Sequence, residues 1–371
     1  MTARRTDRDR LQARILDFIQ TVDVQADALP ASAEAQFEEL ALAVFRYQFD
    51  TNPAYQNLCR RRGITPETLA RWQDIPAVAT ASFKHVDLFC GDPAEAVAVF
   101  HTSGTTQSRP GRHFFRTLEL YRAAAMRWFR VCCLPDVERL PVLILGPSAE
   151  QFPHSSLGQM FSWIRETFGR TDSLVAFTPD GIAYEDAIPW LLERIARREP
   201  VLILGTSLAL WSWCENEVIR RESLTLPEGS RIIDTGGYKG KKQTLSREAY
   251  LHMLSGTFGL ASEWIFNEYG MTELSSQMYE SRFTAGRFGR GVKVAPPWLR
   301  IMSCDPQTLA VLPEGRSGVL RFFDLANLDS VAMLQTEDFG AVRGRTVRLE
   351  GRLIGAEPRG CSLLAEEILQ S

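Results

Sequence analysis

Apolar side chains recur at every third or fourth position in the first fifty residues, the spacing expected of helices that bury one face. Two separate sets have this spacing, and they predict two successive helices between residues 9 and 50. Their apolar positions are Leu11, Ile15, Phe18 and Ile19, followed by Phe37, Leu40, Leu42 and Phe45. We expect this helical segment to pack on the rest of the chain.

From residue 96 onward, short runs of Val, Leu and Ile alternate with amphipathic segments. The runs predict strands at Ala96–Phe100, Leu140–Leu145, Leu174–Phe177, Val201–Leu204 and Arg231–Asp234, and the segments predict helices around 117–132, 155–168, 185–198 and 246–255. Apolar strands that alternate with helices are typical of a mostly parallel sheet covered on both faces. The predicted fold class is therefore α/β.

The pattern changes between residues 284 and 354, where shorter runs are separated by Pro and Gly clusters. These runs predict strands at Val292–Val294, Leu299–Met302, Gly318–Phe323 and Thr346–Leu349. Closely spaced short strands favour a second, β-rich lobe. We therefore expect a helical lead-in over 1–80, an α/β core over 81–283 and a β-rich lobe with the C-terminal segment over 284–371.

Composition and charge narrow the class of protein. The chain has 371 residues, of which 45% are hydrophobic and 23% charged, and this composition is typical of a globular protein. A net charge of -3 gives no basic field for nucleic acid. Seven scattered cysteines without a Cys-x-x-Cys pair favour reduced thiols and a cytoplasmic location. The longest apolar run, Val201–Trp213, is too short to span a bilayer.

The first candidate for chemistry is Thr102-Ser103-Gly104-Thr105-Thr106, which directly follows the predicted strand ending at Phe100. Four hydroxyls around one glycine offer many hydrogen-bond donors to a bound anion, so the segment reads as a phosphate-binding loop. It is not a Walker A loop, because Gly-Lys-Ser/Thr never follows. A polar loop at the end of a strand is the alternative interpretation.

Two later segments carry further candidates. Asn267-Glu-Tyr-Gly-Met-Thr-Glu273 combines an aromatic ring, a glycine, a hydroxyl and a carboxylate, which suit a base, a phosphate and a hard cation. The same residues could instead begin a helix. Asp338, followed fourteen residues later by Arg352, could hold the two hydroxyls of a ribose. The alternative is that both are ordinary turn residues.

The order of these segments resembles that of the core motifs in the adenylate-forming superfamily, over roughly residues 80–365. Within it, the chain is most similar to the acyl-protein synthetase (LuxE) family. The segments that carry this likeness are Asp234-Thr-Gly-Gly-Tyr-Lys239, Asn267-Glu-Tyr-Gly-Met-Thr-Glu-Leu-Ser-Ser-Gln277 and Gly355-Ala-Glu-Pro-Arg-Gly-Cys-Ser-Leu363. The resemblance implies the large-domain fold of adenylate-forming enzymes.

The resemblance also implies roles for individual residues. The phosphates of ATP would be held by Thr102, Ser103, Gly104, Thr105 and Thr106. Gly236 and Gly237 would flank the adenine and the acyl carbonyl, while Tyr269 stacks on the base next to Gly270. Thr272 would contact the phosphate that becomes AMP, and Glu273 would bind Mg2+. Asp338 would hold the ribose hydroxyls, with Arg352 nearby on ribose or phosphate.

The implied activity is ATP-dependent activation of a carboxylic acid to an acyl-adenylate, followed by acyl transfer to a thiol. The resemblance to the LuxE family implies that the acid is a fatty acid. The acceptor would be a protein cysteine, a carrier protein or CoA, and a reductase or thioesterase could be a partner subunit. Cys361 is a candidate for acylation, because the neighbouring Arg359 favours its thiolate.

Two departures from the superfamily pattern affect catalysis. The glycine and lysine that usually follow the hydroxyl loop are replaced by Gln107 and a Ser-Arg-Pro series. The small C-terminal lid domain with its lysine does not fit into the 19 residues after Arg352. We therefore expect no full lid domain, and Lys239, Arg109 or Arg112 become candidates for the catalytic cation.

Two other functions stay open at this point. A nucleotide-binding subunit that has lost catalysis would also carry these motifs. A serine hydrolase of α/β type would use Gly205-Thr-Ser-Leu-Ala209 as an imperfect nucleophile elbow. Its triad would need Ser207, Asp234 and His252, the one histidine that follows the serine in the sequence.

Overall fold

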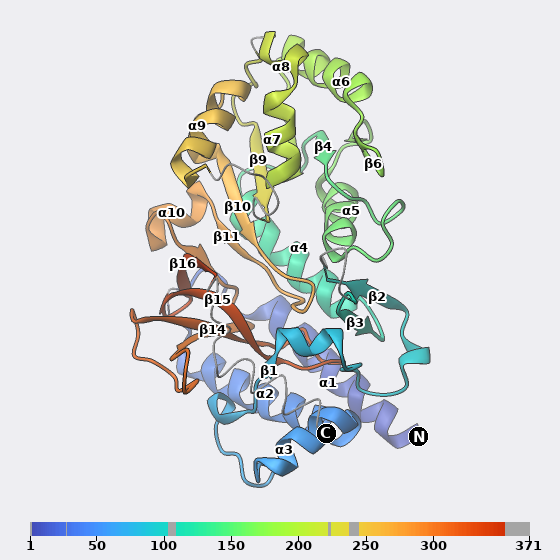
Figure 1. Ribbon diagram of the computed structural model, residues 1–371, viewed down its shortest axis with the longest axis vertical. Coiled ribbons are helices and arrows are strands. Elements are labelled where there is room, and N and C mark those ends of the chain that lie inside the picture. The colour runs from blue at the N-terminus through green and yellow to red at the C-terminus, as the bar shows by residue number, and fades with distance from the viewer. Residues whose placement is uncertain (1, 27, 103–108, 222–223, 237–244, 353–371) are drawn as a thin grey trace. The chain divides into compact units, whose positions relative to one another are not determined.

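The computed structural model describes residues 2–26, 28–102, 109–221, 224–236 and 245–352 (Figure 1). Contacts group the chain into two compact units. The first unit contains the described residues up to Trp128, the segment Met271–Gln277 and the described residues from Val292 on. The second unit contains Phe129–Gly270 and Met278–Gly291. These units cross the predicted boundaries at 81 and 284, and the three-part division stays a prediction.

The first unit begins with three helices, α1 (Thr2–Thr21), α2 (Ala31–Thr51) and α3 (Pro53–Arg61). The two predicted helices are confirmed, and the apolar positions predicted for them are buried except for the partly exposed Leu42. The helix α3 was not predicted. Asn52 separates α2 from α3 because its side chain accepts the Tyr55 N–H while Pro53 occupies the first helical turn.

The rest of the first unit is rich in strands, as the turn-rich pattern after residue 284 predicts. An antiparallel meander has the order β13 (Leu299–Cys304), β14 (Ser317–Asp324), β15 (Met333–Arg343), β16 (Thr346–Arg352) and β12 (Lys293–Val294). The short strand β1 (Val78–Ala79) pairs in parallel with β15. A separate hairpin consists of β2 (Ala98–His101) and β3 (Arg112–Phe115). Short 3-10 turns are η1 (Trp72–Asp74), η2 (Thr80–Lys84) and η3 (Pro93–Glu95).

The second unit is built on a mostly parallel sheet. Its strand order is β5 (Leu174–Val175), β4 (Val142–Leu145), β8 (Leu202–Thr206), β9 (Arg231–Thr235), β10 (Ile265–Tyr269) and β11 (Met278–Glu280), of which β11 alone runs antiparallel to its neighbour. The strands β6 (Phe177–Thr178) and β7 (Gly181–Ile182) form a small hairpin. The predicted α/β class is confirmed.

Helices accompany these strands along the chain. They are α4 (Glu119–Cys133), inside which the boundary between the units falls, α5 (Ser156–Phe168), α6 (Tyr184–Ala196), α7 (Ser207–Glu215), α8 (Glu217–Arg221), α9 (Arg247–Phe258), η4 (Ser262–Trp264) and α10 (Arg282–Phe288). In Figure 1, α7 and α9 lie next to β9. Apolar side chains of both helices join those of β4, β8 and β9 in one buried cluster.

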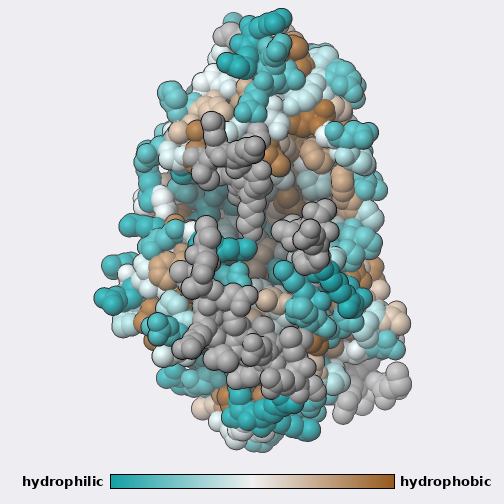
Figure 2. Space-filling model, viewed as in Figure 1, coloured by the Kyte–Doolittle hydropathy of each residue, from teal (hydrophilic) through white to brown (hydrophobic). Residues whose placement is uncertain are grey.

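The surface of the described part is mostly polar. Large exposed hydrophobic side chains are few and scattered in the described part, and the face in Figure 2 is mostly hydrophilic where it is coloured. No helix in the described ranges is both long enough and apolar enough to cross a membrane.

Candidate active site

The hydroxyl loop is carried by the β2–β3 hairpin of the first unit. Two hydrogen bonds close its base: the Thr102 N–H donates to the Gly111 carbonyl over 2.9 Å, and the Gly111 N–H donates to Thr102 Oγ1 over 2.8 Å. Thr102 therefore uses its side-chain oxygen to fix the loop ends. Ser103, Gly104, Thr105 and Thr106 lie outside the described residues.

Thr272 and Glu273 lie in a turn of the first unit, between β10 and β11 in the sequence. The alternative that they begin a helix is wrong, because the segment Met271–Gln277 contains no helix. Thr272 Oγ1 donates to the His101 carbonyl over 3.3 Å, and His113 Nδ1 lies 2.7 Å from the Thr272 carbonyl oxygen. The turn is thus hydrogen-bonded to both strands that carry the hydroxyl loop.

His113 is a fixed neutral donor in this arrangement. It is buried and packs against the rings of Phe83 and Phe115, and its burial lowers its pKa to about 4. Because its partner is a carbonyl oxygen, Nδ1 must carry the proton. This residue was not predicted, since a lone histidine in a short strand has no pattern that reveals a partner 159 residues away.

Glu273 has the most perturbed carboxyl group among the predicted site residues. Burial raises its pKa to about 7, an effect that the cations Arg352 and Lys84 oppose and that the carboxylate of Asp338 reinforces. These three charged groups therefore lie within electrostatic range of Glu273. A carboxylate with a raised pKa among charges of both signs is a candidate for function.

Asp338 and Arg352 face each other across the antiparallel pair of β15 and β16. Arg352 Nε donates to Asp338 Oδ1 over 2.9 Å, and the carboxylate side chain is 15% exposed while the arginine is 46% exposed. The alternative that both are turn residues is wrong, because both belong to strands. The structure brings Asp338, Arg352 and Glu273 together, although 65 residues separate Glu273 from Asp338 in the sequence.

The connection between β14 and β15 is hydrogen-bonded to the segment that contains the Thr272–Glu273 turn. It is buried throughout, and Asn327 Nδ2 donates to the Glu273 carbonyl over 2.7 Å while its Oδ1 accepts the Ser275 hydroxyl at 2.6 Å. Asp324 accepts the Ser275 N–H and the Ser276 hydroxyl. Burial raises the pKa of Asp324 to about 6 in spite of these bonds. No sequence pattern marked Asn327 or Asp324.

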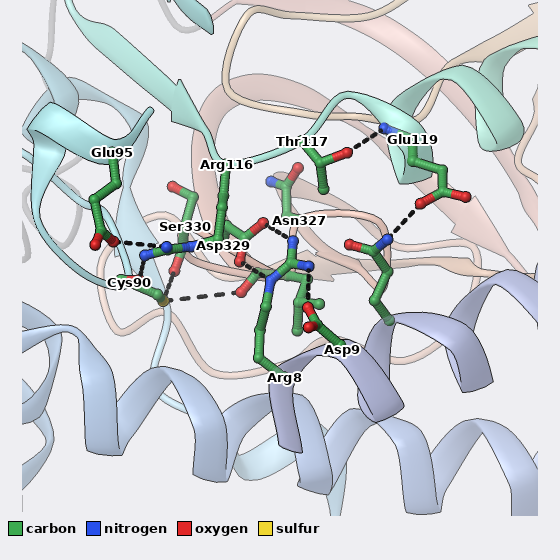
Figure 3. Close-up of polar contacts among 12 residues, drawn as sticks. Arg8, Asp9, Cys90, Glu95, Arg116, Thr117, Glu119, Asn327, Asp329 and Ser330 are labelled. Carbon is green, nitrogen blue, oxygen red and sulfur yellow. Dashed lines mark hydrogen bonds and ion pairs between the residues drawn. The ribbon is translucent and has the colours of Figure 1, made fainter. Parts of the chain in front are cut away.

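The same connection is anchored to the N-terminal helix (Figure 3). The guanidinium of Arg8, buried although it lies near the start of α1, forms a two-point ion pair with Asp329, in which Nε lies 2.9 Å from Oδ1. The Asp329 carbonyl accepts the Cys90 N–H, and the Ser330 hydroxyl donates to the Leu88 carbonyl. These contacts fix the loop on which Asn327 depends.

In the second unit, Gly236 and Tyr269 lie at the carboxyl ends of neighbouring parallel strands, β9 and β10. Open α/β sheets bind ligands at this edge. Gly236 is exposed with a φ of +85°, and a Cβ built on it would meet nothing within 4 Å. The position therefore has open space above it and a backbone conformation that favours glycine. Gly237 lies outside the described residues, and Gly270 ends this part of the unit.

Asp234, one strand position before this edge, organises a buried polar cluster. Its carboxylate accepts hydrogen bonds from Ser207 Oγ over 2.5 Å, the Tyr250 hydroxyl over 3.0 Å and Asn267 Nδ2 over 2.8 Å, and it forms an ion pair with Arg247. Ser207 thus bonds directly to the aspartate, whereas a hydrolase triad needs a histidine between them. The structure contradicts the hydrolase arrangement.

The predicted catalytic cations differ in their exposure and in their pairing with carboxylates. Arg109 is exposed. Arg112 donates two hydrogen bonds to Asp87 over 2.6 and 2.8 Å, so the charge of Arg112 is already balanced. Lys239 and Cys361 lie outside the described residues.

Replacing His113 with Phe should change how stability depends on pH. The folded pKa of about 4 is below that of an unfolded histidine, so the histidine stabilises the fold above about pH 6.5 and loses this contribution as the pH falls. Near pH 4, the free energy of unfolding has fallen by about 3 kcal/mol through this histidine alone. We expect His113→Phe to be less stable than the parent at pH 7, with a difference that shrinks toward pH 4.5 in urea unfolding. His113→Asn, whose amide restores the donor to Thr272, should regain part of the loss at pH 7; a constant difference at all pH values would contradict the assignment.

Comparison with known proteins identifies the family. The family model described as acyl-protein synthetase, LuxE, matches residues 1–369. The long-chain-fatty-acid–luciferin-component ligase of Vibrio harveyi is 26% identical over 344 residues, covering 87% of this chain and 85% of that protein. The ligase of the same name from Aliivibrio fischeri is 23% identical over 352 residues, covering 90% and 88%.

Solved structures show the likeness of fold. A 2-hydroxyisobutyryl-CoA ligase in the postadenylation state, in complex with 2-HIB-AMP, has a TM-score of 0.64 and 15% identity, covering 91% of this chain and 74% of that one. The same enzyme in an open conformation with 2-HIB-AMP and CoA has a TM-score of 0.62 and 14% identity. The expected adenylate-forming fold is confirmed by this likeness. With the family model matching nearly the whole chain, the protein belongs to the acyl-protein synthetase (LuxE) family.

Proposed function

We propose that this protein uses ATP to convert a fatty acid into an acyl-adenylate and then transfers the acyl group to a thiol. The observation that carries the proposal is the grouping of Glu273, Asp338 and Arg352. Glu273 lies in a turn that is hydrogen-bonded to both strands that carry the hydroxyl loop. The names of the two curated relatives support a long-chain acid and a ligase activity.

In the first step, a carboxylate oxygen of the fatty acid attacks the α-phosphorus of ATP. An oxygen–phosphorus bond forms, the bond to the bridging oxygen breaks, and pyrophosphate leaves with that electron pair. The protein supplies position and charge in such a step rather than covalent chemistry. Asp338 would hold the ribose hydroxyls, Tyr269 would stack on the adenine and Thr272 would bind the α-phosphate.

The residues present fit a magnesium ion. Glu273 offers a hard oxygen ligand in a turn fixed by hydrogen bonds to its own carbonyl and to that of Thr272. The described residues contain no cluster of three or more His, Cys, Asp or Glu side chains that could hold a metal. One carboxylate is nevertheless enough here, because magnesium often binds through one or two carboxylates and the phosphates of its substrate. The ion would neutralise phosphate charge.

In the second step, a thiolate attacks the acyl carbonyl and AMP leaves. The six cysteines whose structure is described are all buried, and burial raises the pKa of Cys59 to about 12 and that of Cys214 to about 11. Such thiols are poor nucleophiles. The acceptor in our proposal is therefore Cys361 or a thiol outside the chain, on a carrier protein or CoA. A reductase or thioesterase partner and a cytoplasmic location stay predictions.

The proposal is tested by ATP–pyrophosphate exchange. Purified protein with ATP, magnesium, labelled pyrophosphate and a panel of carboxylic acids should move label into ATP only when a suitable acid is present. Tight ATP binding without exchange for any acid would instead favour a subunit that has lost catalysis.

Replacing Cys361 with Ser should separate the two steps. We expect acid-dependent exchange to continue, because the first step needs no thiol, while label from a radioactive fatty acid no longer becomes covalently attached to the protein. Mass spectrometry of the intact protein checks this, and Cys304→Ser is the matched control because Cys304 is buried. Unchanged covalent labelling of Cys361→Ser would remove this cysteine from the mechanism.

A further inference from the structure

Lys84, which was not among the predicted site residues, lies beside the candidate active site. It is the last residue of η2, which directly follows β1. Because β1 pairs with β15 through Val78 and Leu334 and through Ala79 and Gln335, η2 is held next to the strand that carries Asp338.

The neighbouring Phe83 fixes this segment against the base of the hydroxyl loop. Phe83 is buried, and its ring meets that of His113 edge-on with a centroid distance of 5.7 Å. A Cβ added to Gly111 would lie 3.2 Å from the backbone carbonyl carbon of Phe83 and 3.1 Å from Thr102 Oγ1. The backbone of η2 therefore packs directly against Gly111, one of the two residues that close the loop.

Lys84 also lies within electrostatic range of Glu273. Three arginines of the same unit are already paired: Arg352 with Asp338, Arg112 with Asp87 and Arg116 with Glu95. Across the described ranges, by contrast, no ion pair or side-chain hydrogen bond involves the Lys84 ammonium, and the residue is partly exposed. A partly exposed lysine at this place has its charge available for a ligand.

We propose that Lys84 is a catalytic cation of the adenylation step and that its ammonium contacts the phosphates of ATP between Glu273 and the base of the hydroxyl loop. The inference rests on the proposed function. When the bond between the α-phosphorus and the bridging oxygen breaks, negative charge grows on the departing pyrophosphate, and the ammonium stabilises it without giving up a proton. A lysine is suited to this as a compact point charge with three donors.

The test uses Lys84→Met, which removes the charge but keeps most of the stem, and Lys84→Arg, which keeps the charge. Arg316→Met is the matched control, because Arg316 is an exposed cation of the same unit in the turn before β14. We expect acid-dependent exchange to fall about 10- to 100-fold in Lys84→Met, the range for one charge-assisted contact to phosphate. Lys84→Arg should recover part of this loss, and Arg316→Met should match the parent.

A binding measurement separates a phosphate contact from a structural effect. By calorimetry, Lys84→Met should bind pyrophosphate and ATP at least about tenfold more weakly than the parent, while its affinity for AMP stays the same. Equal loss for all three ligands, or exchange equal to that of the parent, would overturn the inference. If Lys84→Met does not fold, as judged by its thermal midpoint, Lys84→Gln provides the same comparison. No exchange by the parent with any acid would count against the proposed function itself, whereas the pyrophosphate and AMP affinities would still decide the phosphate contact.

Discussion

Asp338→Ala should lower acid-dependent ATP–pyrophosphate exchange by about 100- to 10,000-fold, because the proposed carboxylate accepts two ribose hydroxyls at about 1.5–3 kcal/mol each. The substitution also leaves the Arg352 guanidinium without the carboxylate that lies 2.9 Å away. Exchange kinetics at increasing ATP should show a raised KM for ATP, since ribose binding contributes to the ground state as well as to the transition state.

The nucleotide itself provides a second test of this contact. The parent should discriminate strongly between ATP and 2′,3′-dideoxy-ATP, and Asp338→Ala should lose most of that discrimination because the hydroxyls no longer have a partner. Glu337→Ala is the matched control, since alternate side chains of a strand point to opposite faces. Discrimination that survives in Asp338→Ala would show that another group holds the ribose.

Glu273→Gln should lower exchange by about 100-fold or more, since it removes the one charged oxygen ligand proposed for magnesium. Glutamine keeps the shape of the side chain, so the hydrogen bonds of the turn backbone to His113 and Asn327 should persist. A magnesium titration should show half-maximal exchange at a concentration at least about tenfold higher than in the parent.

Stability separates this result from damage to the fold. Burial raises the pKa of Glu273 to about 7, so the charged carboxylate destabilises the metal-free protein as the pH rises through that value. Glu273→Gln should therefore be at least as stable as the parent at pH 8 without magnesium, and this advantage should shrink below pH 7. A variant that loses both exchange and stability at pH 8 would contradict the assigned role.

Periodicity predicted most of the fold. The helices α1, α2, α4, α5, α6 and α9 and the strands β4, β8 and β9 were expected from apolar spacing, and all are present. The helix α7 was missed because it continues the apolar run of β8 with hydrophobic residues on nearly every side, so no period of 3.6 emerges. Its start at Ser207 depends on Thr206, whose side chain accepts the Ala209 N–H.

The candidate site was predictable only where residue type and motif order carry information. Glu273, Asp338 and Arg352 were named from the sequence, and the structure places them within reach of one another. Asn327 and Lys84 were not named, because a lone asparagine or lysine in a short connection has no spacing that signals a partner. Asn327 is joined to Glu273 by a hydrogen bond across 54 residues, and Lys84 interacts with Glu273 electrostatically across 189 residues. Only the folded chain reveals these interactions.

Activation of the fatty acid as an acyl-adenylate can be followed with an oxygen isotope. A fatty acid labelled with oxygen-18 in its carboxyl group is incubated with the protein, ATP, magnesium and a thiol acceptor, and the nucleotide product is examined by mass spectrometry. Because the attacking oxygen stays on phosphorus when the thiol takes the acyl group, we expect AMP that carries one labelled oxygen. Label in inorganic phosphate together with ADP, or unlabelled AMP, would contradict it.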